Sequence, residues 1–247
     1  MKRGPAAGSL VIAVAMTMVF GGTVSAATPR SCPAELPQGS DPVTLDPADF
    51  GGPIDNPYWP MAPKTTWAYK EGRTQRVRIS VKSRTKEILG IGATVVHDVV
   101  RDRGQLVEDT LDWYAQDRCG TVWYLGEKTA EYEDGVVVST AGSWEAGVDG
   151  AFPGVIVPAD PTVGLTYRQE YYAGEAEDAA RILSTDERVQ VPYGSFRDAL
   201  LTKDFTPLHP KMLEYKLYAK GVGPVLVLGV SKGSQREELI RFSAPTP

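Results

Sequence analysis

The residues with the clearest chemical potential are carboxylates that the sequence places beside aromatic side chains. If residues 105–116 form a regular strand, Asp109 shares a face with Leu111 and Trp113, because alternate side chains of a strand point to the same side. A carboxylate among apolar groups loses hydration, and this raises its pKa towards the range that a general acid needs. Asp109 is therefore a candidate catalytic acid, and the alternative is a structural hydrogen bond to a neighbouring strand or an Arg.

Two further carboxylates extend this hypothesis. Glu170 lies with Arg168 and Tyr172 on one face of an expected strand over residues 165–172, either as an acid in a cleft or as a partner in a cross-strand ion pair. Glu145 follows a Trp in a long loop. A pair of acids, Asp109 with Glu145 or Glu170, is the arrangement that a hydrolase or lyase acting on polysaccharide would use.

The loop over residues 140–164 is the expected place for a binding site. It is rich in Gly and Pro, is too long for a mere connection, and carries Trp144, Glu145 and Asp149. An exposed Trp beside carboxylates can stack on a sugar ring and hydrogen-bond its hydroxyls; alternatively, Trp144 folds back as a lid on the core. With Trp113 and Tyr172, these residues form the predicted ligand-binding set.

The chain offers few residues for a Ser-His-Asp triad or a metal site. Its two histidines are His97 and His209. His97 and Asp98 are adjacent on an expected strand and point to opposite faces, so they cannot form the orienting pair of a Ser-His-Asp triad. The loop lacks an Asp-x-Asp-x-Asp run and the chain lacks clustered His or Cys, so we expect no metal site and no cofactor.

The elements that must position these residues are predicted to be β-strands. Residues 76–82 alternate strictly between apolar and polar side chains, which indicates an antiparallel sheet with one solvated face. Short turns join the successive strands, as in a meander. We expect a single all-β domain over residues 64–247, folded as a closed or half-closed antiparallel barrel. Its expected strands cover residues 76–82, 94–100, 105–116, 121–125, 165–172, 182–191, 198–206, 212–220, 225–230 and 237–242.

The N-terminal region is predicted to direct export. Residues 1–26 combine Lys2 and Arg3 with an apolar stretch and a small-residue site at Val24-Ser25-Ala26, the pattern of a cleaved signal peptide. The apolar stretch is shorter than a bilayer span, so we expect a secreted, extracellular protein that begins near Ala27 and has no stable membrane insertion after cleavage. Residues 27–63, rich in Pro and Gly, are expected to form an irregular arm.

Charge and cysteine content narrow the partners and the environment. The loss of Lys2 and Arg3 takes the formal net charge from −5 to −7, and no dense basic run remains, so nucleic acid is an unlikely partner. Cys32 and Cys119 are the two cysteines of an exported chain, and such a pair usually forms a disulfide bond. In the loop-entropy account this bond would stabilise the fold by roughly 3–4 kcal/mol.

Three motifs resemble a family of secreted bacterial β-rich proteins that has no established activity. They are Asn56-Pro57-Tyr58-Trp59-Pro60-Met61 with Thr65-Thr66-Trp67-Ala68-Tyr69, Val191-Pro192-Tyr193-Gly194-Ser195-Phe196, and Tyr218-Ala219-Lys220-Gly221-Val222-Gly223. The segments 107–114 and 142–147 are similar to actinobacterial members of this family. The chain departs from the pattern at Lys64, where Gly is expected, and at Cys119, which stands in a turn usually filled by polar residues. The resemblance implies a β fold and assigns no catalytic residue.

These observations favour a non-enzymatic secreted module that binds an apolar or amphipathic small molecule in the mouth of a barrel. The alternatives are an extracellular polysaccharide hydrolase or lyase, with a glycan as its partner, and a structural protein of the cell surface. The binding module and the hydrolase or lyase can be distinguished by one feature of the structure, which is whether two of the candidate acids converge in an open cleft.

Overall fold

The computed structural model describes residues 1, 32, 35–230 and 235–245. The chain separates into two units, Met1–Cys32 and Pro33–Pro247, and the second unit contains the fold discussed below. The predicted signal peptide lies outside the described residues, apart from Met1. No helix within the described ranges is long and apolar enough to cross a membrane.

The described part of the chain is built from strands and one short 3-10 helix, η1. Its elements, in chain order, are η1 (Pro47–Asp49), β1 (Thr66–Glu71), β2 (Gln75–Ile88), β3 (Ile91–Asp102), β4 (Gln105–Gln116), β5 (Val122–Glu133), β6 (Val136–Ser139), β7 (Trp144–Glu145), β8 (Phe152–Val157), β9 (Thr166–Arg168), β10 (Glu170–Tyr171), β11 (Ala179–Val191), β12 (Gly194–Phe205), β13 (Leu213–Ala219), β14 (Gly223–Gly229) and β15 (Gln235–Ser243).

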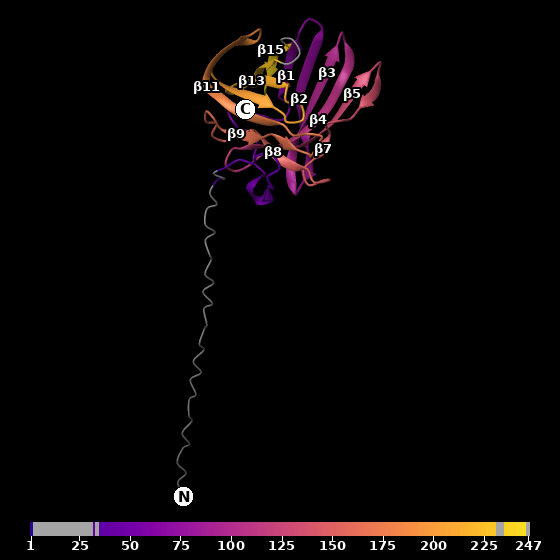
Figure 1. The fold of residues 1–247 in the computed structure, drawn as a ribbon. Helices are drawn as coiled ribbons and strands as arrows, with labels where there is room; N and C mark the ends of the chain where they lie inside the picture. The colour runs from indigo at the N-terminus through magenta and orange to yellow at the C-terminus, as the bar shows by residue number, and fades with distance from the viewer. Residues whose placement is uncertain (2–31, 33–34, 231–234, 246–247) are drawn as a thin grey trace. The chain divides into compact units, whose positions relative to one another are not determined.

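The strands form one antiparallel sheet whose order is β10-β8-β5-β4-β3-β2-β1-β15-β14-β13-β12-β11-β9. Strands β6 and β7 both pair with β5 outside this path. Consecutive strands pair from β1 to β5 and from β11 to β15, as expected for a meander, and β1 pairs with β15 to join the two halves (Figure 1). The predicted all-β, antiparallel class is confirmed.

The sheet is not closed, so of the two expected forms, a closed or a half-closed barrel, the closed one is wrong. The end strands, β9 and β10, are separated in sequence by Gln169 alone, yet β9 pairs with β11 and β10 with β8. The backbone N–H of Arg168 donates to Pro37 O, and those of Gln169 and Glu170 both donate to Asp178 O. The three N–H groups therefore do not pair with a single neighbouring strand, and residues 168–170 pass from one edge of the sheet to the other.

Gly154 allows the two edges to approach so closely. A Cβ atom at this position of β8 would lie 2.1 Å from Gln169 O. A contact that short is forbidden, so any side chain here would push the backbone of residues 169–170 away from β8.

The irregular arm is not a loose extension of the sheet. Among residues 35–63, η1 is the only helix or strand, as the Pro- and Gly-rich composition predicts. Nevertheless Trp59 is buried and lies 5.5 Å from Tyr114 and 6.0 Å from Tyr218, measured between ring centroids. The buried Asn56 donates from Nδ2 to Gly120 O and Pro158 O, which ties the arm to two turns.

Three local expectations can be compared with the structure. Lys64 has a φ of 75°, the left-handed conformation that Gly adopts most readily, which explains why Gly is expected at this position. Both cysteines are disulfide-bonded, so the predicted bond between Cys32 and Cys119 is confirmed. The segment 140–164, expected to be a loop without strands, contains β7 and β8, because both pair with β5.

Candidate functional site

The main cavity of the fold, about 480 Å³ in volume, lies between the two halves of the sheet. It is lined by strands from β1 to β5 and from β13 to β15, so the open sheet curls around it. Its walls carry eight carboxylates, and we call this space the acidic cavity. They are Glu71, Asp98, Glu108, Glu127, Glu170, Asp178, Glu214 and Glu237.

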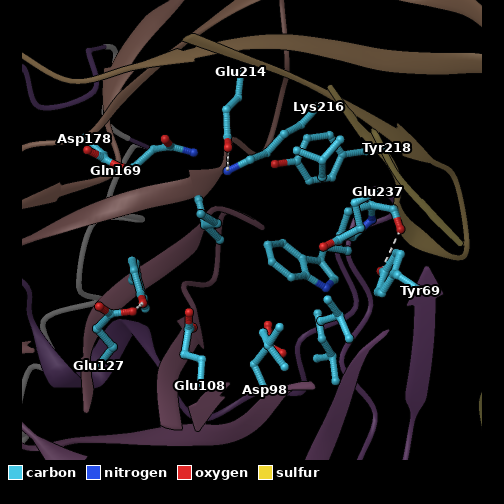
Figure 2. Close-up of a pocket in the computed structure, with 18 of the residues that line it drawn as sticks. Tyr69, Asp98, Glu108, Glu127, Gln169, Asp178, Glu214, Lys216, Tyr218 and Glu237 are labelled. Carbon is cyan, nitrogen blue, oxygen red and sulfur yellow. Dashed lines mark hydrogen bonds and ion pairs between the residues drawn. The ribbon is translucent and has the colours of Figure 1, made fainter. Parts of the chain in front are cut away.

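Strand alternation delivers these carboxylates to the interior. Seven of them come from seven different strands, one from each of β1, β3, β4, β5, β10, β13 and β15, and Asp178 directly precedes β11. On β13 the side chains of Glu214, Lys216 and Tyr218 all reach the cavity, since residues two apart share a face. Figure 2 shows Glu127 and Glu108 on one wall, with Glu214 and Lys216 on the wall opposite.

The cavity walls carry little positive charge, and this charge is already part of ion pairs. Lys216 is the one Lys or Arg among the described lining residues. Its Nζ lies 3.0 Å from Asp204 Oδ2 and 3.6 Å from Glu214 Oε2. Lys216 is thus already paired, and no ion pair to the other seven carboxylates is found within the described ranges.

Burial and mutual repulsion keep several of these groups protonated near neutral pH. Burial, reinforced by the charge of Asp112, raises the pKa of Glu127 to about 8 although Tyr124 hydrogen-bonds it. Burial and the charge of Glu71 raise the pKa of Glu237 to about 7. For Asp98, burial raises the pKa well above its usual range, and nearby carboxylates add to this effect.

Glu127 and Asp112 both contact the hydroxyl group of Tyr124, and this arrangement requires one of the two carboxyl groups to be protonated. Tyr124 Oη lies 2.7 Å from Asp112 Oδ1 and 2.7 Å from Glu127 Oε2. A phenol has a single proton and can donate to one carboxylate, so the second contact needs a proton on the other carboxyl group. Burial raises the pKa of Asp112 to about 6, lower than that of Glu127. At neutral pH Glu127 therefore holds the proton and donates to Tyr124, which donates to Asp112.

One buried carboxylate oxygen points to a ligand. Asp98 Oδ1 is fully buried and has no hydrogen-bond partner among the described residues, although buried polar atoms are nearly always paired. Tyr69, Tyr114, Tyr124 and Trp59 stand in the same cavity wall and offer aromatic rings next to the carboxylates. Carboxylates and aromatic faces are the two groups that bind organic cations best.

Asp109 lies outside this cavity, which corrects the expected environment of its side chain. It is on the outer face of β4, where its Oδ1 and Oδ2 lie 3.0 and 3.1 Å from His97 Nε2 on β3. The polar face of β4, which includes Glu108 and Tyr114, is the one that lines the interior. Sequence reasoning expected Asp109 to be a desolvated acid among apolar side chains, whereas its side chain is 38% exposed and paired with His97.

Glu170 lies inside the acidic cavity, and its partner is a tryptophan. Trp144 Nε1 donates to Glu170 Oε2 over 2.7 Å, and no ion pair to Glu170 is found among the described residues. The expected neighbour Arg168 instead donates to the carbonyl oxygens of Gly39, Asp41 and Pro153. Burial raises the pKa of Glu170 well above its usual range, and Asp178 and Glu127 raise it further.

The predicted ligand-binding residues do come together, in a separate space. A pocket of about 350 Å³, which we call the loop pocket, is lined by Trp113, Trp144, Glu145, Asp149 and Tyr172 among others. Trp144 is only 4% exposed, so the arrangement is that of the lid rather than that of an exposed sugar platform. Lys86 fills part of the space, with its Nζ 2.5 Å from Glu145 Oε2 and 3.5 Å from the Trp113 ring centroid.

The three candidate acids therefore do not converge. Asp109 is paired with His97 on the outer face, Glu145 is paired with Lys86, and Glu170 is inside the acidic cavity. The hydrolase hypothesis lacks the geometry on which it depended. No group of three or more His, Cys, Asp or Glu side chains in the described ranges is arranged to hold a metal ion.

Sequence reasoning missed most of the carboxylates that line the interior. The alternation of Glu108, Thr110, Asp112 and Tyr114 on β4 was a visible signal, because it marks a continuous polar face. The same spacing recurs in Glu214, Lys216 and Tyr218 on β13. Single strands do not reveal that such faces from opposite halves of the sheet share one cavity.

Comparison with known proteins finds two solved structures of low similarity. No family model and no curated protein matches the chain. One solved structure, assigned as an exported protein with a YmcC-like fold from Bacteroides fragilis NCTC 9343, is 16% identical with a TM-score of 0.44, over 76% of this chain and 99% of that chain. Another, assigned as a lipoprotein from Parabacteroides distasonis ATCC 8503, is 12% identical with a TM-score of 0.41, over 75% and 98%. Membership of an actinobacterial group stays a prediction.

Proposed function

We propose that this protein is a secreted, non-enzymatic module that binds an organic cation bearing an amine in the acidic cavity. The observation that carries the proposal is the set of eight carboxylates around one cavity whose single lysine is already ion-paired. An ammonium group that enters the cavity gains charge-assisted hydrogen bonds and relieves repulsion among the carboxylates.

The walls favour an organic cation over a metal ion. The carboxylates are contributed singly by different strands, and within the described part of the chain they form no cluster with the spacing of a metal site. Aromatic rings such as Trp59, Tyr69 and Tyr218 line the same space, and an ammonium group bound against such rings gains a cation–π contribution. Asp98 Oδ1, buried without a partner, is a natural acceptor for an N–H group.

Isothermal titration calorimetry at pH 8 tests the proposal on the mature protein. The probes are 1,4-diaminobutane and spermidine, with succinate and inositol as an anionic and a neutral control. We expect both amines to bind and both controls to fail, because the cavity is acidic. Equal heats for spermidine and inositol would contradict the proposal.

Paired variants locate the binding. Glu108→Gln and Glu214→Gln, on opposite walls, should each weaken spermidine binding, whereas Glu238→Gln should leave it unchanged. Glu238 is a matched control because it is on β15 next to Glu237 but pairs with Lys70 and Arg236 outside the cavity. An equal loss in all three variants would show that amines bind the acidic protein non-specifically.

A further inference from the structure

A second pocket, more apolar, adjoins the acidic cavity. This apolar pocket of about 440 Å³ lies beside β9, β10 and the connection between β12 and β13, and its size is typical of sites for small organic ligands. Apolar side chains form much of its wall, namely Tyr171, Phe205, Pro207, Pro210, Met212 and Leu213.

Two carboxylates belong to both spaces. Glu170 and Asp178 line the apolar pocket and also line the acidic cavity. Both come from the segment where the two edges of the sheet meet, and the backbone carbonyl of Asp178 accepts hydrogen bonds from the N–H groups of Gln169 and Glu170. The fold thus places apolar side chains and acidic groups on either side of a shared wall.

We infer that the ligand is an amphiphilic amine, with its ammonium group at Glu170 and Asp178 and its hydrocarbon chain in the apolar pocket. This inference rests on the proposed function and specifies its ligand class. A hydrophilic polyamine would leave the apolar pocket unused, and a fatty acid with its head group at Glu170 and Asp178 would place its carboxylate beside two others. Arg168 and Lys203 also line the apolar pocket, but Arg168 already donates to three backbone carbonyl groups.

The apolar pocket is open to a chain that arrives from solvent. Phe205 is 36% exposed and Met212 is 45% exposed, large values for apolar side chains that line one pocket. Lys203 lies over the Phe205 ring at 5.9 Å from its centroid. A hydrocarbon chain that covers Phe205 and Met212 would remove this apolar surface from water.

A chain-length series tests the inference with calorimetry on the mature protein. The probes are butylamine, hexylamine, octylamine and decylamine, all below their micellar concentrations, with octanoate and octanol as head-group controls. We expect affinity to rise by roughly fourfold for each added CH₂ that becomes buried. Octanoate and octanol should bind at least tenfold more weakly than octylamine.

Variants separate the head group from the chain. Phe205→Ser and Met212→Ser should abolish most of the gain in affinity from butylamine to decylamine. Asp178→Asn should weaken all amines by a similar factor. Ile240→Ser is the matched control, because Ile240 is 37% exposed on β15 and lines neither space.

The outcomes distinguish the two proposals. If decylamine binds no more tightly than butylamine while spermidine still binds, the amphiphile inference is wrong and the proposed amine-binding function stands. If no amine binds, both are wrong. If decylamine and octanoate bind equally, the apolar pocket takes hydrocarbon chains without regard to the carboxylates, and the inference also fails.

Discussion

Trp144 donates its indole N–H to the carboxylate of Glu170 over 2.7 Å, which joins the segment 140–164 to the wall of the acidic cavity. The ring also stands edge-on to Tyr124, with 5.3 Å between ring centroids. Trp144, which the sequence suggested as a binding residue, is thus a buried side chain that hydrogen-bonds one of the carboxylates lining the acidic cavity.

Replacing Trp144 tests this support. Trp144→Ala removes a buried ring and should lower the free energy of unfolding by about 3–5 kcal/mol. Trp144→Phe keeps a ring but leaves Glu170 without its donor, so a smaller loss of about 1–3 kcal/mol is expected. Urea denaturation followed by circular dichroism measures both. An alanine variant as stable as the native protein would show that the ring does not support the core.

Stability should depend on pH through the buried carboxyl groups. The pKa of Glu127 is raised from 4.5 to about 8 in the folded protein, so the folded state holds a proton that the unfolded state has lost between these values. Stability from this group is therefore fully present below about pH 4.5 and is lost as pH rises towards 8. The thermal midpoint should fall between pH 5 and pH 8 by several degrees.

The variant Glu127→Gln isolates the contribution of this group. Gln cannot ionise, yet its amide can still donate to Tyr124, as the protonated acid does. The fall in thermal midpoint between pH 5 and pH 8 should be clearly smaller in the variant. The same slope in both proteins would assign the pH dependence to other carboxylates.

Adjacent residues on β4 provide a comparison of its two faces. Glu108 lines the acidic cavity, whereas Asp109 pairs with His97 on the outer face. Glu108→Gln should weaken spermidine binding by about fivefold, the value of an interaction on the order of 1 kcal/mol. Asp109→Asn should change binding less than twofold and stability by under about 1 kcal/mol. Calorimetry decides, and a larger effect on binding from Asp109→Asn would reverse our assignment of the faces.

The disulfide bond should contribute to stability measurably. Cys119 stands in a turn whose Asp117 Oδ1 accepts from the N–H groups of Cys119 and Thr121, so Cys119→Ser should leave the turn intact. The variant should lose about 2–4 kcal/mol of unfolding free energy, because the chain between the cysteines is no longer closed into a loop. Alkylation of the unreduced native protein should add no mass. Two labelled thiols would contradict the bond.

The sequence by itself determined the all-β class and most of the long strands, with consecutive strands paired as neighbours. Period-two alternation and short turns identified β4 with the bounds that the structure shows, and predicted the meander, because these signals are local. The disulfide bond followed from the presence of two cysteines alone. Trp113, Trp144 and Tyr172 line one pocket that Lys86 occupies in part, and their role in ligand binding stays a prediction.

Only the tertiary structure decided which face of each strand is inside. Alternation separates two faces but does not say which one lines the cavity, and on β4 it is the polar face with Glu108 and Tyr114. The pairing of β1 with β15 brings carboxylates from residues 71 to 237 around one space. Their raised pKa values, and the junction with the apolar pocket at Glu170 and Asp178, arise from contacts between residues distant in sequence.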